Sequence, residues 1–254
     1  MYRTSHLLLM GAIVLLFATT HCANCQADDF RVDNRVFMGE QAAPQSEGTT
    51  IFQDGCVYDF LKGANEVIVF DKPRQRFVLL DLGRRVRTEL PQREVEQFVA
   101  RIKQRTAGSN NAMVKFLGDP NFQESFNPVT TLLRMQSEWL TYEVRLTPAS
   151  SDQVAQYRDF ADWYAGLNAM LYPASLPPFA RIMLNKAITQ HHGIAREIHL
   201  SAKNRRGEAQ SLRSEYELIP KLVQEDRDRV AGFRQDMATF TAVAFGEYRK
   251  TAGQ

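Results

Sequence analysis

The sequence contains few of the residues that build disulfides, metal centres or thiol-dependent active sites. Only three of its 254 residues are cysteine and five are histidine. Cys22 and Cys25 lie in an N-terminal segment that we expect to be removed, which leaves Cys56 alone and excludes an intramolecular disulfide. The remaining roughly 225 residues must hold together through ordinary apolar burial, which a domain of that size can supply.

The sequence motifs of common enzyme classes are also missing. The sequence contains no G-x-S-x-G elbow, no glycine-rich phosphate loop and no H-E-x-x-H pair. The carboxylate pairs Asp54 with Asp59 and Asp71 with Asp81 lie beside expected turns, where aspartate bonds to the backbone. We therefore predict no catalytic residues and no cofactor. A non-enzymatic protein is favoured over an enzyme.

The histidines offer one arrangement that resembles a metal site. His191 and His192 lie at an expected helix end near Gly193, where imidazoles can contact the last carbonyls. A site built from His192, Glu197 and His199 can be drawn on the following strand. Zinc needs three or four converging ligands, so capping and surface roles are favoured and no metal is predicted.

Neither sign of charge is in clear excess. Lysine and arginine number 31 against 29 aspartates and glutamates, and loss of residues 1–27 removes Arg3 alone, which lowers the formal net charge from +2 to +1. A near-neutral chain has no electrostatic footprint for nucleic acid, so no nucleic-acid partner is predicted. The basic groups at 84–87 and 203–206 are expected to be solvated turn and edge charges.

Long hydrophobic runs are absent after the N-terminus. The apolar run Leu7–Phe17 follows Arg3 and precedes small and polar residues up to Ala27, which is typical of a secretory signal peptide cut after Ala27. The run is shorter than the roughly 20 residues of a membrane span, although an uncut anchor is the alternative. We expect a soluble exported protein, periplasmic or extracellular, with no transmembrane span in the mature chain.

The first half of the mature sequence predicts an antiparallel meander. The expected strands after an initial one over 29–39 are Thr49–Gln53, Cys56–Leu61, Glu66–Asp71 and Arg76–Asp81. Turns this short join only antiparallel neighbours. Because both faces of these strands are apolar, the sheet is either covered on both sides, which is favoured, or lines a cavity for an apolar ligand. In the second case the candidate ligand-binding residues are Tyr58, Phe60, Val67, Val69, Phe77 and Leu79.

The second half predicts helices packed on further strands. An apolar stripe from Val95 to Ile102 indicates a helix after Pro91, and Ser150 with Gln153 in capping-box spacing opens another. The other expected elements are strands at 112–116, 129–135, 140–146, 194–200 and 212–218, and helices at 152–170, 179–189 and 223–250. Residues 28–254 are thus expected to form a single α+β domain, a curved antiparallel sheet with three to four packing helices, including a long C-terminal one.

Cys56 follows the Asp54-Gly55 turn and shares a face with Tyr58 and Phe60 by strand alternation. A nucleophilic cysteine needs a base and a polarising environment, and no local sequence signature provides them. We expect Cys56 to be a small buried filler.

The segment 50–90 resembles the half-barrel meander of LolA-like periplasmic lipoprotein carriers. The residues that carry the resemblance are Asp54, Gly55, Val57, Tyr58, Asp71, Phe77 and Leu80. The resemblance implies a curved antiparallel sheet whose concave face, closed by helices, binds lipid or lipoprotein acyl chains without catalytic residues. The segment from Pro177 onward also resembles an uncharacterised secreted bacterial family.

These observations favour an exported binding or carrier protein for an apolar or lipidic ligand in the cell envelope. The first alternative is an envelope protein–protein interaction module with a fully packed core. The second is a hydrolase with an unrecognised site. A cavity beside the apolar strands favours the first function over both alternatives.

Overall fold

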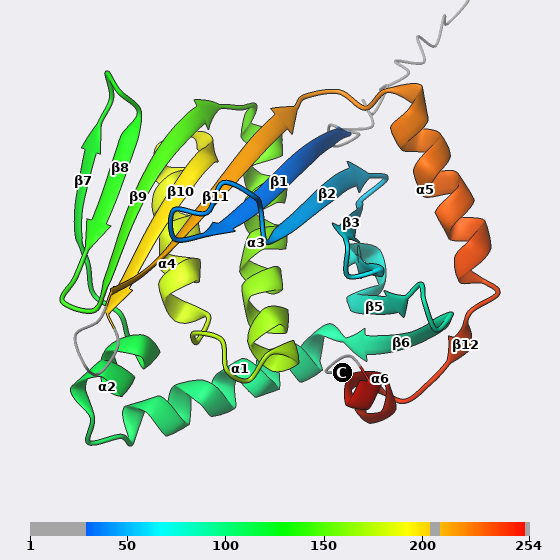
Figure 1. The fold of residues 1–254 in the computed structure, drawn as a ribbon, viewed down its shortest axis with the longest axis horizontal. Coiled ribbons are helices and arrows are strands. Elements are labelled where there is room, and N and C mark those ends of the chain that lie inside the picture. Colours follow the sequence, from blue (N-terminus) through cyan, green and yellow to red (C-terminus); the bar gives the residue numbers. More distant parts are fainter. Residues whose placement is uncertain (1–28, 204–208, 252–254) are drawn as a thin grey trace, which may run out of the picture.

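The computed structural model describes residues 29–203 and 209–251. The expected signal peptide, residues 1–27, lies outside the described residues. Within them the chain forms one large sheet and six α-helices (Figure 1). The strands are β1 (Phe30–Met38), β2 (Ser46–Gln53), β3 (Cys56–Lys62), β4 (Glu66–Asp71), β5 (Arg76–Asp81), β6 (Val86–Pro91), β7 (Gln123–Asn127), β8 (Leu132–Gln136), β9 (Leu140–Pro148), β10 (Gly193–Lys203), β11 (Ala209–Ile219) and β12 (Thr241–Ala242). The helices are α1 (Gln92–Ala107), α2 (Ala112–Gly118), α3 (Ser151–Leu171), α4 (Phe179–Gln190), α5 (Gln224–Met237) and α6 (Phe245–Thr251), with a short 3-10 turn η1 (Lys72–Arg74).

The strands of the described chain lie in the order β12-β6-β5-β4-β3-β2-β1-β11-β10-β9-β8-β7. Neighbours pair antiparallel except β12, which runs parallel to β6. The N-terminal meander joins the later strands through β1, which pairs with β2 on one side and β11 on the other. The predicted α+β class with an antiparallel sheet is confirmed.

Both faces of the meander are covered by helices. On one face, which we call the helix-side face, Phe52, Phe70 and Phe77 pack with residues of α1 and α3. On the opposite face, the α5-side face, Tyr58, Phe60 and their neighbours pack against Val230 and Phe233 of α5. Figure 1 shows α3 and α4 side by side on one side of the central strands, with α5 separate from them. This arrangement explains why these strands have no polar face.

The helices with strong sequence signals begin where they were predicted. Helix α1 follows Pro91 and ends at Gly108, and α3 opens with the expected capping box. In that box the Gln153 backbone N–H donates to Ser150 Oγ (3.2 Å), and the Ser150 backbone N–H donates to Gln153 Oε1 (3.1 Å). Together the two bonds satisfy donors that a helix start leaves open.

Two predicted elements of the middle segment are wrong or incomplete, and two strands were missed. Residues 112–116 form the start of helix α2 rather than a strand, because Asn111 caps it by accepting a hydrogen bond from the Val114 N–H. The predicted strand at 129–135 is really a turn followed by β8. Strands β6 and β7 were not predicted, since charged and polar residues interrupt both.

The long C-terminal helix predicted over 223–250 is also wrong, because the chain breaks after Met237. Thr239, Thr241 and Val243 are β-branched and lose side-chain freedom in a helix. The backbone N–H groups of Thr241 and Val243 instead donate to the carbonyls of Arg85 and Arg87 on β6, at 3.0 and 2.9 Å. The helical stripe therefore belongs to two short helices, α5 and α6.

The break lets the C-terminal segment reach both faces of the sheet. Phe240 is buried in the cluster of the α5-side face, whereas Tyr248 of α6 is buried in the cluster of the helix-side face. The chain between them passes the β6 edge, where β12 pairs.

Candidate functional site

The six candidate residues from the sequence divide between the two faces of the sheet. Tyr58, Phe60, Val67 and Val69 lie on the α5-side face, and the Phe233 ring lies 6.3 Å from Tyr58 and 5.5 Å from Phe60, measured between ring centroids. Phe77 and Leu79 belong to the helix-side cluster. The six therefore do not line one common cavity.

A cavity does exist on the helix-side face, a short distance along the sheet from the residues that were proposed. It has a volume of about 440 Å³ and lies between the central strands, α3, the α3–α4 connection and the start of α4. We call it the inner cavity. Most of its lining is apolar or aromatic, and the residues are Asn34, Val36, Ser46, Thr50, Asp59, Leu61, Tyr142, Tyr157, Phe160, Ala161, Tyr164, Ala165, Asn168, Ser175, Leu176, Pro177, Pro178, Arg181, Ile198, Leu200, Leu212, Ser214 and Tyr216.

Strand register explains why the sheet wall of the inner cavity has room. Asn34 of β1 lies opposite Gly48 of β2 and opposite Tyr216 of β11. A Cβ at Gly48 would come within 2.7 Å of Asn34 Oδ1, so only glycine leaves the Asn34 side chain its place. The absence of a side chain at Gly48 thus leaves space for Asn34, which lines the inner cavity.

The inner cavity has a deep end and an open end. Thr50 and Asp59 are each 2% exposed, and Phe160 is also buried. Ser46 and Leu176 line the same cavity but are exposed, and Leu176 is 38% exposed. The cavity therefore opens between the start of β2 and the α3–α4 connection.

Asp59 supplies a carboxyl group at the deep end. Burial raises its pKa to about 6, although hydrogen bonds from Thr50 and Tyr164 favour the charged form. The Thr50 hydroxyl donates to Asp59 Oδ1 at 2.7 Å. The sequence predicted that the Asp59 carboxylate bonds to the backbone of a turn. This is wrong, because Asp59 lies within β3 and its side chain points to the helix-side face. By contrast, Asp71 and Asp81 do accept backbone hydrogen bonds at turns, from Arg74 and Arg84.

Arg181 supplies a positive charge to the same cavity. Its Nε donates to Asn185 Oδ1 at 3.0 Å, and Tyr216 is a further hydrogen-bond partner. The nearby carboxylate of Asp162 is already engaged by Asn185 Nδ2 (2.8 Å) and Arg158 Nε (3.5 Å). Within the described residues Arg181 forms no ion pair.

Tyrosine hydroxyls surround these two charges. Burial raises the pKa of Tyr142 to about 12 and raises the pKa values of Tyr157 and Tyr164 further. These hydroxyls are therefore neutral at physiological pH and can donate hydrogen bonds. Arg181 and Asp59 both act on Tyr157, which places that ring near both charges.

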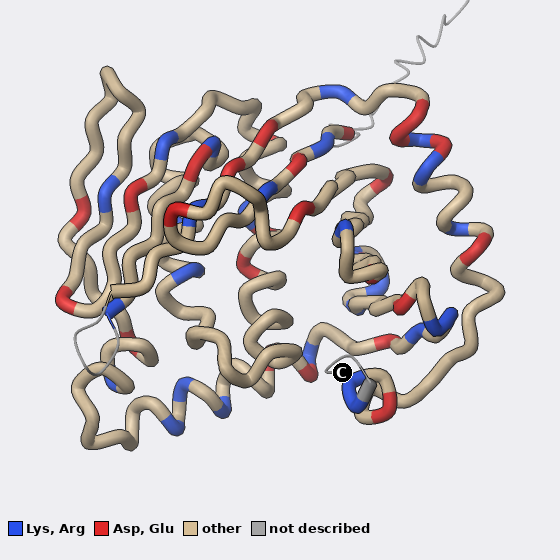
Figure 2. The backbone as a smooth tube through the Cα atoms, viewed as in Figure 1, with Lys and Arg blue, Asp and Glu red and all other residues tan. Residues whose placement is uncertain are grey.

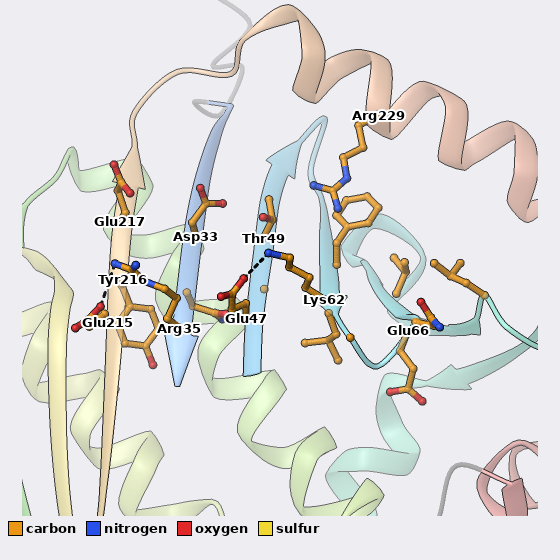
Figure 3. A pocket seen from close by; sticks show the side chains of 18 of the residues that line it. Asp33, Arg35, Glu47, Thr49, Lys62, Glu66, Glu215, Tyr216, Glu217 and Arg229 are labelled. Carbon is orange, nitrogen blue, oxygen red and sulfur yellow. Dashed lines mark hydrogen bonds and ion pairs between the residues drawn. The ribbon is translucent and has the colours of Figure 1, made fainter. Parts of the chain in front are cut away.

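A second hollow lies on the opposite side of the sheet. This charged groove has a volume of about 920 Å³ and is bordered by β1, β2, β3, β11 and α5 (Figure 3). Two ion pairs cross it, since Lys62 contacts Glu47 at 2.6 Å and Arg35 contacts Glu215 at 3.0 Å. The Arg229 guanidinium lies 4.0 Å from the Phe60 ring centroid. Charges of both signs also lie along α5 (Figure 2), and the groove itself is lined by acidic and basic residues together.

Cys56 lies at the edge of the α5-side cluster and is half-buried, close to the filler role expected from the sequence. Burial raises the pKa of its thiol, and the neighbouring Asp71 carboxylate raises it further. A raised pKa reduces the thiolate fraction, so the surroundings of Cys56 do not activate it as a nucleophile.

The histidines serve different local contacts. The His191 ring stacks on Phe126 at 3.9 Å between centroids, and its Nε2 lies 3.1 Å from Glu124 Oε1. His199 Nε2 lies 2.9 Å from Glu197 Oε1, while His192 occupies the turn before β10 with φ +54°. Across residues 29–203 and 209–251, no three potential metal ligands converge.

Sequence reasoning missed Asp59 and Arg181 as members of one site. Each had a signal, because Asp59 interrupts the apolar run of β3 and Arg181 interrupts the apolar start of α4. The sequence did not show that both side chains face the same cavity.

Comparison with known proteins provides no family assignment. No family model and no curated protein matches the chain. None of the helices in the described part of the chain is long and apolar enough to cross a membrane.

Proposed function

We propose that this protein is a binding or carrier module for an apolar or amphipathic ligand, and that the ligand occupies the inner cavity. The observation that carries the proposal is a partly enclosed cavity with largely apolar walls and a few polar groups at defined positions. Small-molecule sites generally combine these two properties.

The size of the inner cavity suits a small ligand. Its volume of about 440 Å³ lies within the usual range for small-molecule sites. Ser46 at the mouth and Thr50 at the deep end are four residues apart on β2, which corresponds to a depth of roughly 13 Å. An extended acyl chain can lie along this direction, parallel to the strand.

We further propose that this binding takes place outside the cytoplasm. The signal-peptide pattern supports export, and the resemblance to LolA-like carriers supports a lipidic ligand. The cavity between the sheet and helices α3 and α4 gives such a ligand a place to bind.

The direct test is to purify the mature chain gently, identify bound molecules by native mass spectrometry and extraction, and measure binding of a fluorescent fatty-acid analogue. Ala165→Phe places a ring in the inner cavity, whereas Ala155→Phe adds the same ring at an exposed position of the same helix. We expect the first variant to lose binding and the second to retain it. Equal binding by both variants, or none by the wild type, would contradict the proposal.

A second candidate, a protein-interaction module, is favoured by strand β7. This strand forms one end of the sheet, and four of its five residues are exposed. An open strand edge can pair with an extended segment of a partner. Ser125→Pro on β7 tests this alternative, because it would abolish partner capture and leave ligand binding unchanged.

A further inference from the structure

We propose that the ligand of the inner cavity is an amphiphile with one negative charge, a long-chain carboxylate, whose head group binds to Arg181. This inference rests on the proposed function, and it adds the charge and chemical class of the head group. It follows from the partners of Arg181 and from the other polar groups of the cavity.

Arg181 has more hydrogen-bond donors than described partners. A guanidinium carries five N–H donors in a fixed plane. Asn185 accepts one of them, and Tyr216 is the other described partner. Since Arg181 lines the inner cavity, its remaining donors are available to a ligand there.

The charge of Arg181 is also not neutralised by the described protein. Burying a charge is costly unless it is paired, and arginine stays protonated under all ordinary conditions. Both described contacts are neutral groups, and Asp162 is directed to Asn185 and Arg158. A carboxylate ligand would supply the missing negative charge and form a bidentate contact with the guanidinium.

The rest of the cavity favours a single negative charge over two. Arg181 is the one cation among the lining residues, and Asp59 is the one carboxylate. With a pKa of about 6, Asp59 is mostly ionised at neutral pH and would repel a phosphate dianion more strongly than a carboxylate. The Tyr142 and Tyr157 hydroxyls are neutral and can donate to the same head group.

The experiment compares four probes with the same alkyl chain, namely dodecanoate, dodecanol, dodecyl phosphate and dodecyltrimethylammonium. Calorimetric titration of the mature protein should show dodecanoate binding roughly tenfold more tightly than dodecanol, the usual effect of one charge-assisted hydrogen-bond pair. Tighter binding of the phosphate or the ammonium probe overturns the carboxylate assignment. This comparison needs no variant, so it is independent of any folding defect.

Two substitutions then locate the head group. Arg181→Met should remove the preference for dodecanoate while dodecanol binds as before, and Arg181→Lys should restore part of it. Arg93→Met, at an exposed position of α1, is the matched control and should keep the wild-type preference. If dodecanoate and dodecanol bind the wild type equally, the head-group inference fails and the proposed function stands. If no probe binds, both fail.

Discussion

The Thr50 hydroxyl donates a 2.7 Å hydrogen bond to the Asp59 carboxylate across the β2–β3 pair, where the two residues lie directly opposite each other. Both side chains are 2% exposed, in a region of the sheet that is otherwise apolar. Burial raises the pKa of Asp59 to about 6 even with this hydrogen bond. An ionised group at the deep end of the inner cavity therefore costs folding stability at neutral pH.

Replacing Asp59 by asparagine should stabilise the protein at neutral pH. Between the usual aspartate pKa near 3.8 and about 6, the folded state keeps a proton that the unfolded state has lost, so stability falls as pH rises through this range. The unfolding free energy of the Asp59→Asn variant, taken relative to that of the wild type, should therefore rise by on the order of 3 kcal/mol as the pH goes from about 4 to about 7.5. Denaturant unfolding at both pH values measures the gain. If the difference in unfolding free energy between the variant and the wild type is the same at both pH values, the raised pKa of Asp59 is contradicted.

Asp71 should behave in the opposite way. Burial raises its pKa, but hydrogen bonds and charges from Arg74 and Arg76 outweigh burial, so the net pKa lies below the usual value. Its contribution to stability is therefore present above the unfolded-state pKa and is lost as pH falls through the lower folded-state pKa. Asp71→Asn should cost roughly 1–3 kcal/mol at neutral pH and progressively less in acid. An equal cost at all pH values would show that the charge plays no part.

Phe233→Ala should destabilise the fold without affecting the inner cavity. Phe233 is 9% exposed and contacts Tyr58 and Phe60 edge-on, so its removal leaves a void under α5. We expect a loss of about 3 kcal/mol in unfolding free energy. Fatty-acid binding should remain, measured well below the lowered melting temperature. Loss of binding in the folded variant would place the ligand on the α5-side face instead.

Cys56 should react slowly with thiol reagents. Burial and the Asp71 carboxylate raise its pKa, which keeps the thiol protonated at neutral pH. Labelling of Cys56 in the native protein should be at least roughly tenfold slower than labelling of the same residue in denaturant. Equal rates would indicate an exposed or activated thiolate.

The strands and helices that depend on local periodicity were predicted from the sequence. The helix break that depends on pairing with a distant strand was not. The alternation in β3, β4 and β5 and the stripe of α1 predicted those elements, because burial repeats with the period of the local backbone. The break after Met237 was missed, because it is stabilised by hydrogen bonds to β6, far away in the sequence. An apolar stripe continues through Phe240 and Tyr248 even though the two residues pack on opposite faces.

The sequence left open whether the apolar meander is covered on both faces or lines a cavity. The two-sided apolar meander indicated either full coverage or a cavity, and the structure shows coverage at Tyr58 and Phe77 with a cavity farther along the sheet. Asp59 and Arg181 are brought to that cavity from β3 and α4, and their meeting depends on how α4 packs. Strand alternation in one segment carries no information on that packing.

The pairing of β1 with β11 also determines when the protein can finish folding. Arg31 of β1 pairs with Ile219 of β11, so the first strand of the described chain can form this pairing only after β11 has been made. Closing so long a loop is slow, and until it closes β1 has only β2 as a partner. A newly made chain therefore cannot complete the centre of its sheet until almost all of it has been synthesised, and the edge of β1 that β11 will cover stays unpaired until then.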